Sequence, residues 1–377
     1  MKGTIRVRSN KAGQKRYYCQ VYAGLDPRTG KKRYLTATAT SEREAHRAIH
    51  RLVEQLEAGN VPRSRATLTE LIDAWMKAAG PPGEYTRTVY EGFIANHVAD
   101  GIGRTRVSKL RAEDLDHWYA ELRLKGLAPA SVRKLHNIVR GALTQGVKWG
   151  WVSSNAATMS SPPAVPKSVV ATPRPAAVRE MIDGASAVDP SFGVYLRLAA
   201  VTGARPGEMC GLRWSDLHRD SGELSIERRV VRTKPEPLVK DLTKTGKTRR
   251  IPLDQRTLDA LADHRQKMED RAGEFEAQLV ADAYMFTDEP DGTGFWRPDS
   301  VSRRFRTLRD RGGWAAVPLY GLRHQAATTL IDRGVDAKTV SERLGNSVVT
   351  VLGTYTRART AADRGAAATI ANALDGD

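Results

Sequence analysis

A proline-rich stretch with little hydrophobic periodicity interrupts the chain between Ser153 and Pro175. It contains five of the 18 prolines, with Ser and Ala around them, which is typical of an extended linker between domains. A shorter break, Val61-Pro62-Arg63-Ser64-Arg65, lies nearer the N-terminus. The two breaks predict three domains, each long enough to bury its own core, at residues 1–62, 66–152 and 173–377, with a linker at 153–172.

Positive charge is concentrated in the first of these domains. The chain has a formal net charge of +17, and residues 1–65 hold 15 Lys and Arg against 5 Asp and Glu. Such an excess points to a polyanionic partner, nucleic acid before membrane surface, unless the segment is only a solubilising basic tail. The two cysteines exclude a disulfide framework. Without a signal-like or membrane-spanning apolar run, we expect a soluble, cytoplasmic, nucleoid-associated protein with no membrane partner.

The basic segment is patterned for structure, which argues against a mere tail. Alternation at Ile5–Arg8, Tyr17–Tyr22 and Arg33–Thr38, with turn residues between, predicts a three-stranded meander. A helix follows, with Ser41 and Glu44 as a capping box. A small basic sheet backed by a helix can lay one face in the DNA major groove. Its candidate DNA contacts are Arg6, Arg8, Lys15, Arg16, Lys31, Lys32 and Arg33.

The middle domain is predicted to be helical. Thr67 and Glu70 mark the start of its first helix, and four or five helices fill residues 66–150. The tryptophans are interpreted as core residues rather than base-stacking residues: Trp118, Trp149 and Trp151. A long linker between two moderately basic globules suggests a clamp that closes around a duplex.

The last domain combines helices with a small antiparallel sheet. A helix over Phe192–Ala200 is broken by Gly203, and Pro206 can start the next helix with Arg205 at its N-terminal end. Residues 223–253 are expected to form the sheet, with a basic hairpin tip at 243–248. Further on, Tyr320 and Arg323 share a helix face. Asp336 caps the next helix, which ends at Gly345.

Five short motifs in this domain occur in one order. They are Thr202-Gly203-Ala204-Arg205-Pro206-Gly207-Glu208, Thr243-Lys244-Thr245-Gly246, Leu322-Arg323-His324, Leu344-Gly345-Asn346-Ser347 and Thr354-Tyr355. Together they resemble the signature of the tyrosine recombinases, the phage-integrase family, over all of residues 173–377. The middle domain resembles the family's core-site-binding domain. The basic N-terminal sheet resembles the arm-site-binding domain of integrases from phages and integrative elements.

The resemblance implies a role for each matching residue. Tyr355 would be the nucleophile that forms a 3′-phosphotyrosyl bond and frees a 5′-hydroxyl. Arg205 and Arg323 would bind the non-bridging oxygens of the scissile phosphate, and Lys244 would protonate the leaving 5′-oxygen. Glu208 would support the site.

Two positions depart from the family pattern. Tyr320 stands where the family usually has His, and Asn346 stands where it usually has His or Trp. Both can hydrogen-bond a phosphate oxygen, but Asn346 cannot shuttle a proton. His324 is adjacent to the expected base, yet it should point to another face, so it is interpreted as a packing or supporting residue.

The chemistry expected from the residues agrees with these roles. Fixed guanidiniums can neutralise an anionic phosphodiester, and a phenol with a pKa of about 10 needs cationic neighbours or a base. The chain has no Gly-rich P-loop and no acidic metal cluster; Asp288, Glu289 and Asp291 are interpreted as a turn. We therefore expect no metal, no cofactor and no ATP requirement.

The sequence thus predicts a mixed α/β, mainly helical chain: an N-terminal three-stranded β-sheet domain, a helical core-binding domain and an α+β catalytic domain. The expected activity is site-specific recombination of a mobile element. Expected partners are double-stranded DNA attachment sites, three further copies in a tetramer, and DNA-bending or directionality factors. Two alternatives stay open: a type IB topoisomerase with the same chemistry, and a non-catalytic DNA-binding regulator descended from a recombinase.

Overall fold

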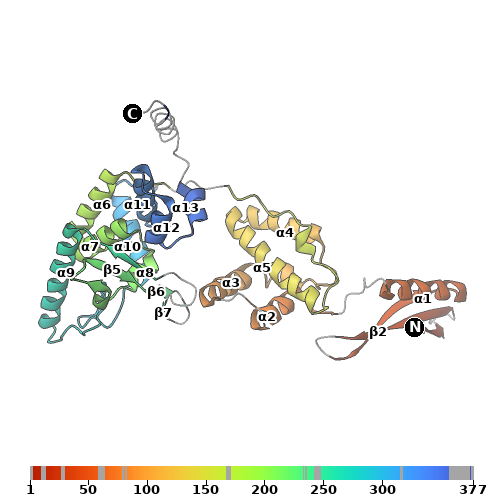
Figure 1. Cartoon of the computed structure of the whole chain (residues 1–377). Helices are drawn as coiled ribbons and strands as arrows, with labels where there is room; N and C mark the ends of the chain where they lie inside the picture. Colours follow the sequence, from red (N-terminus) through yellow and green to blue (C-terminus); the bar gives the residue numbers. More distant parts are fainter. Residues whose placement is uncertain are drawn as a thin grey trace. The chain divides into compact units, whose positions relative to one another are not determined.

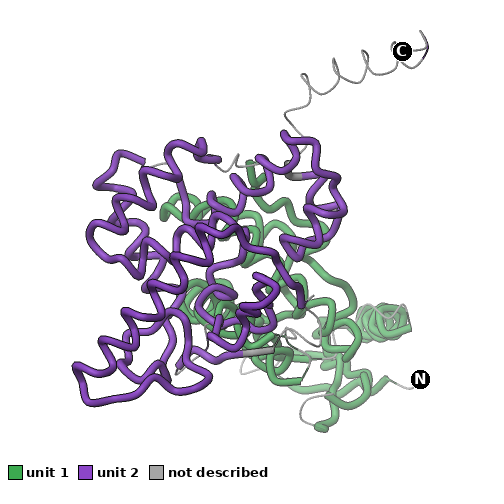
Figure 2. Tube along the Cα trace, turned by 60° about the vertical axis from the view of Figure 1, so that its left-hand side comes forward, with its two compact units in different colours: residues 1–167 green, residues 168–377 purple. Residues whose placement is uncertain are grey.

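The computed structural model describes residues 3–9, 14–26, 30–57, 64–78, 80, 83–166, 171–231, 233, 236–241, 248–314, 317–355 and 374. The chain separates into two compact units, residues 1–167 and residues 168–377 (Figure 2). Both are mainly helical, with small antiparallel sheets (Figure 1). No helix within the described ranges is long and apolar enough to span a membrane.

The first unit begins with the predicted three-stranded meander. Its strands are β1 (Gly3–Ser9), β2 (Lys15–Leu25) and β3 (Lys32–Ala39), paired antiparallel in the order β1-β2-β3. Helix α1 (Glu42–Glu57) buries its apolar stripe against one face, which carries Cys19 and Val21. In the capping box, Ser41 accepts from the Glu44 N–H as expected. The Glu44 carboxylate, however, accepts from the backbone N–H and hydroxyl of Thr40.

A helical bundle follows in the same unit. Helix α2 (Leu68–Ala78) starts with the predicted capping box. Thr67 Oγ1 accepts from the Glu70 N–H, and the Glu70 carboxylate accepts from the Thr67 N–H. Trp118 and Trp151 are buried in the bundle core and Trp149 packs against it, which confirms their interpretation as core residues. The bundle comprises α2 (Leu68–Ala78), α3 (Glu84–His97), η1 (Ile102–Arg104), α4 (Ala112–Leu124) and α5 (Pro129–Lys148).

The segment after this bundle is less extended than the proline content predicts. Residues Ala156–Thr158 form the short helix η2, and Ala157 is buried in the bundle core. The Asn155 amide donates to the Arg140 carbonyl at 3.0 Å, which ties the segment to α5. Prolines restrict the backbone of this segment, but the side chains of Asn155 and Ala157 can still pack against the bundle.

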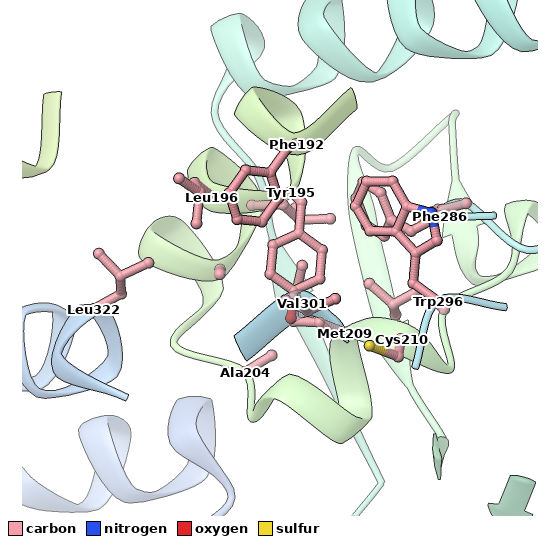
Figure 3. Packing of buried hydrophobic residues seen from close by; sticks show 14 of the residues in the cluster. Phe192, Tyr195, Leu196, Ala204, Met209, Cys210, Phe286, Trp296, Val301 and Leu322 are labelled. Carbon is pink, nitrogen blue, oxygen red and sulfur yellow. The ribbon is translucent and has the colours of Figure 1, made fainter. Parts of the chain in front are cut away.

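The second unit is built around an aromatic core. Tyr195 and Phe286 lie with ring centroids 5.1 Å apart, and the Trp296 ring packs against both at a tilt (Figure 3). Gly203 ends α7 (Pro190–Thr202), as predicted, and its backbone is in the left-handed conformation. The helices are α6 (Pro175–Val188), α7 (Pro190–Thr202), α8 (Pro206–Cys210), η3 (Trp214–Asp216), α9 (Gln255–Glu274), α10 (Pro298–Arg311), α11 (Gly321–Asp332), α12 (Ala337–Leu344) and α13 (Val348–Tyr355).

The strands of this unit form two sheets instead of the single small sheet that we predicted. One sheet has the order β4-β5-β8, and the other pairs β6 with β7. Alternation in a sequence shows which residues share a face but not which strands pair, so the prediction of one sheet was wrong. The strands are β4 (Leu217–His218), β5 (Glu223–Ile226), β6 (Arg228–Val231), β7 (Leu238–Asp241) and β8 (Arg249–Pro252).

The last three helices share a small core of their own. Val340, Leu344 and Val351 are fully buried together with Ala327, so α11, α12 and α13 pack against one another. Asp336 caps α12 by accepting from the N–H groups of Lys338 and Thr339, and Gly345 ends it in the left-handed conformation, as predicted. This core anchors α13 through Val351.

Candidate active site

A tight turn between α7 and α8 positions Arg205. Gly203 has a φ of +63°, and a Cβ atom there would lie 2.4 Å from Leu344. Only glycine fits such a left-handed, close-packed position without strain. Pro206 then starts α8, which leaves Arg205 immediately before the helix, as the sequence predicted. The side chain of Arg205 is 38% exposed, so its guanidinium can be reached from solvent.

Glu208 fixes the orientation of Arg205. One carboxylate oxygen accepts from Arg205 Nη1 at 2.9 Å, and the other accepts from the Arg205 backbone N–H at 2.9 Å. The carboxylate is 3% exposed. Burial acts to raise the pKa of Glu208, but hydrogen bonds and charge interactions with Arg249 and Arg205 outweigh it, so the pKa is lowered. Glu208 therefore stays ionised and holds Arg205 in place.

Asn346, which lies far from Arg205 in the sequence, contacts the same guanidinium. Arg205 Nη2 donates to Asn346 Oδ1 at 2.7 Å and to the Gly345 carbonyl at 3.2 Å. A guanidinium can only donate, so the amide oxygen must face Arg205 and the amide NH₂ must face elsewhere. Two motifs separated by 141 residues thus meet in one cluster.

Arg323 lies next to this turn. Its Nη1 donates to the Gly203 carbonyl at 2.6 Å, two residues before Arg205, and the residue is 1% exposed. Its guanidinium carbon lies 5.9 Å from the centre of the Tyr320 ring, in agreement with a shared helix face. Tyr320 is 39% exposed. The two arginine motifs are therefore joined through one backbone carbonyl.

His324 is buried beneath Tyr320. The two rings meet edge to face with centroids 5.1 Å apart. Burial, followed by the neighbouring charge of Arg323, lowers the pKa of His324. A neutral, packed imidazole agrees with the interpretation of His324 as a packing residue, although its role in catalysis stays a prediction.

The backbone of Tyr355 lies at the C-terminal end of α13, one helical turn after the buried Val351. The side chain of Tyr355 and the whole of Lys244 lie outside the described residues. Their assignments are therefore not tested by the geometry. The segment that carries Lys244 connects β7 to β8, so it enters the strand that holds Arg249.

The candidate DNA-binding residues of the N-terminal sheet divide between its two faces. Arg6, Arg8 and Arg16 alternate with the residues that face α1, so they share the open face with Tyr18 and Gln20. Lys15 and Arg33 lie at the alternating positions of their strands that belong to the α1 face. Lys31 precedes β3 and Lys32 is its first residue. The open face is therefore the basic one available to a partner.

Two arginines that sequence reasoning missed complete the cluster. Arg249 pairs with Glu208 at 2.7 Å, and Arg343 donates to the Val201 carbonyl at 3.1 Å at the end of α7. One signal could have found Arg249: it alternates with Ile251, so it lies on the buried side of its strand. Charged side chains are almost never fully buried unless a group of opposite charge or a hydrogen-bond acceptor pairs with them.

The cluster combines an accessible, anchored guanidinium at Arg205, a buried arginine, Arg323, bonded to the same turn, and the amide of Asn346. Residues 181–362, which include all these groups, match the sequence profile of the Phage integrase family. This part of the chain, residues 181–362, therefore forms a domain of that family. The chain is a tyrosine-type site-specific recombinase.

Curated relatives are similar to this chain over most of their own length. A tyrosine recombinase XerC-like protein of Caldanaerobacter subterraneus is 24% identical over 318 residues, 78% of this chain and 79% of that protein. The ICEBs1 integrase of Bacillus subtilis is 22% identical over 346 residues, 90% of this chain and 92% of that protein. These relatives do not favour a topoisomerase or a non-catalytic regulator.

Solved integrase structures share the fold of this family member. The Tn1549 transposon integrase in complex with transposon right end DNA has a TM-score of 0.70 at 15% identity, covering 81% of this chain and 99% of that chain. A lambda integrase tetramer bound to a Holliday junction has a TM-score of 0.56 at 18% identity, covering 90% of this chain and 91% of that chain. The predicted fold class is confirmed.

Proposed function

We propose that the chain integrates and excises a mobile DNA element, cutting and rejoining strands through a 3′-phosphotyrosine intermediate. The observation that carries this proposal is the contact of Arg205 with both Glu208 and Asn346, which assembles distant motifs around one accessible guanidinium. The phage integrase profile spans these residues and Tyr355. The relatives named as integrases of an integrative element and a transposon support the mobile-element assignment.

In the proposed reaction, Arg205 and Arg323 grip the non-bridging oxygens of the scissile phosphate. The Tyr355 phenol loses its proton to solvent water, and its oxygen forms a bond to phosphorus as the bond from phosphorus to the 5′-oxygen breaks. Lys244 then gives the leaving 5′-oxygen a proton. The covalent bond to Tyr355 keeps the energy of the phosphodiester, so the freed 5′-hydroxyl can attack it and rejoin the strand without ATP. Fixed positive charge beside the phosphate lowers the barrier in both directions.

Asn346 takes the role of a neutral donor in this proposal. Because its oxygen faces Arg205 at 2.7 Å, its NH₂ group is available to a phosphate oxygen on the same guanidinium. An amide cannot accept and release a proton as imidazole can. Asn346 would therefore orient the phosphate and take no part in proton transfer.

The proposed function is tested with a nicked suicide duplex that carries the element's own core site. Cleavage of this duplex releases a short fragment, so the covalent adduct cannot reverse. Wild-type protein should accumulate an adduct that survives denaturing electrophoresis, without added metal or ATP. Tight binding with no adduct would favour the regulator, and relaxation of supercoiled DNA without recombinant products would favour the topoisomerase.

Changing Asn346 to Asp should separate activity from stability. A carboxylate 2.7 Å from Arg205 would pair with the guanidinium and repel the phosphate, so we expect cleavage to fall by about 100-fold or more. The free energy of unfolding should stay within about 1 kcal/mol of wild type, because the new pair is partly exposed. Single-turnover cleavage and thermal unfolding measure the two effects. Asn346→His, which restores the family's usual residue, is the control and should remain active.

The N-terminal domain is proposed to bind accessory arm sites through the open face of its sheet. Deleting residues 1–65 removes Arg6, Arg8 and Arg16, so the salt dependence of binding to full attachment sites should weaken. The slope of log affinity against log salt should drop by about 0.9 for each lost phosphate contact. Binding to the isolated core site should change little. An unchanged slope on full sites would contradict this assignment.

The remaining partner assignments are proposals as well. The lambda integrase tetramer on a Holliday junction supports assembly of four protomers on DNA. The domain limits of 1–62, 66–152 and 173–377, the DNA-bending or directionality factors and the nucleoid-associated location stay predictions.

A further inference from the structure

Arg249 is a buried charged residue to which the proposed mechanism assigns no role. It stands at the start of β8, and its side chain is 6% exposed. Its Nη2 donates to Glu208 Oε2 at 2.7 Å, and its Nε donates to the Arg343 carbonyl at 2.8 Å. The guanidinium therefore connects β8 to α8 on one side and to the end of α12 on the other.

On the α8 side, Arg249 contacts Arg205 through a shared carboxylate. Glu208 Oε1 accepts from Arg205 Nη1, while Oε2 accepts from both the Arg205 backbone N–H and Arg249 Nη2. With Arg249 removed, Oε2 would keep only the backbone N–H of Arg205, so the carboxylate would lose its charged partner from outside the α8 turn. The direction of Arg205 thus depends on the second arginine.

On the α12 side, Arg249 supports the turn that carries Asn346. A Cβ atom on Gly345 would lie 2.8 Å from Arg249 Nη1, so the glycine backbone packs directly on the guanidinium. Gly345 has a φ of +64°, a conformation that also requires glycine. The next residue is Asn346, which accepts from Arg205 at 2.7 Å. Arg249 therefore supports both members of the Arg205–Asn346 pair.

We propose that Arg249 is a positioning residue for strand cleavage, which aligns Arg205 and Asn346 with each other by holding Glu208 and the Arg343–Asn346 turn. This inference rests on the proposed function. Arg249 does not touch DNA in this role, because its guanidinium is enclosed by protein groups. Its planar fork supplies two donors in fixed directions, which a lysine ammonium cannot reproduce.

The role predicts a loss of cleavage rate rather than of DNA affinity. A displacement of a phosphate-binding group by about 1 Å can cost about 100-fold in rate. We expect that loss for Arg249→Met, and about tenfold for Arg249→Lys, which keeps the charge and one hydrogen bond. Affinity for the core site should stay within about threefold of wild type, because the DNA-facing groups remain.

The experiment measures single-turnover cleavage of the nicked suicide duplex at saturating protein. Arg250→Met is the matched control: Arg250 is the next residue of the same strand, is exposed, and loses the same charge. It should cleave at the wild-type rate. Core-site affinity, measured for every variant by gel shift, reports whether the protein is folded.

A second substrate separates positioning from general damage to the fold. A methylphosphonate at the scissile position replaces one charged oxygen with a methyl group and removes the negative charge that Arg205 must meet. On the diastereomer that lacks the Arg205-facing oxygen, the deficits of both Arg249 variants should shrink at least about tenfold, because misplacing that guanidinium then matters less. A destabilised fold would slow both substrates equally.

Two results would overturn the inference: cleavage by Arg249→Met and Arg249→Lys within about threefold of wild type, or equal deficits on the two substrates. Should Arg249→Met fail to bind the core site, the same comparison with Arg249→Lys decides. Failure of the proposed function looks different, because wild-type protein would then form no adduct on either substrate.

Discussion

Replacing Tyr355 with phenylalanine will abolish covalent capture of DNA and leave DNA binding intact. The change removes one oxygen and keeps the ring, so packing at the end of α13 and affinity for the core site should stay within about twofold of wild type. Without that oxygen no bond to phosphorus can form, and cleavage should fall by more than about 10⁴-fold. The measurement is denaturing electrophoresis of the labelled suicide duplex.

Tyr320→Phe is the control for this prediction. It also removes one phenolic oxygen, from a tyrosine that is 39% exposed and packed edge to face on His324. A residue that only donates to the phosphate should lose about 10- to 100-fold in rate and still form the adduct. An adduct that persists in Tyr355→Phe but disappears in Tyr320→Phe would assign the nucleophile to Tyr320 and refute the assignment of Tyr355.

The second large effect is expected at Arg205. In the folded protein its guanidinium bonds to Glu208 and Asn346 while 38% of the side chain is exposed, so it is both anchored and accessible. Arg205→Ala removes the charge that meets the phosphate, and cleavage at saturating protein should fall by about 10³-fold. Arg205→Lys should lose about 10²-fold, since one ammonium cannot replace the guanidinium fork.

Stability should change much less than activity in Arg205→Ala. Glu208 keeps its bond to Arg249 at 2.7 Å, so the buried carboxylate is not left without a cation. We expect the free energy of unfolding, measured by thermal denaturation, to fall by about 1 kcal/mol or less. Full activity at saturating protein with only weaker DNA binding would show that Arg205 contributes to the ground state and not to the transition state, contrary to the proposal.

The departures from the family pattern concern proton transfer more than phosphate binding. Asn346 accepts a hydrogen bond from Arg205, and the centre of the Tyr320 ring lies 5.9 Å from the Arg323 guanidinium carbon. Neither side chain titrates as imidazole does. In the proposed mechanism we therefore expect the positive charge of two arginines to be the main means of favouring the phenolate of Tyr355.

Local chemistry determined what could be predicted from the sequence alone. The capping box of Thr67 and Glu70 and the cap of α12 at Asp336 depend on residues two or three apart, so their side chains find the helix N–H groups wherever the helix lies. The left-handed ends at Gly203 and Gly345 follow from the absence of a Cβ atom. The order of the motifs identified the family for the same reason, because it needs no knowledge of packing.

Only the tertiary structure decided which distant groups meet. Strand alternation predicted a sheet over residues 223–253 but could not show that its strands divide into two sheets. No local rule pairs Arg249 with Glu208, or turns the Asn346 oxygen toward Arg205, because these partners are 41 and 141 residues apart and meet only after their elements have packed. A buried ion pair depends on desolvation and geometry together, and both are properties of the folded chain.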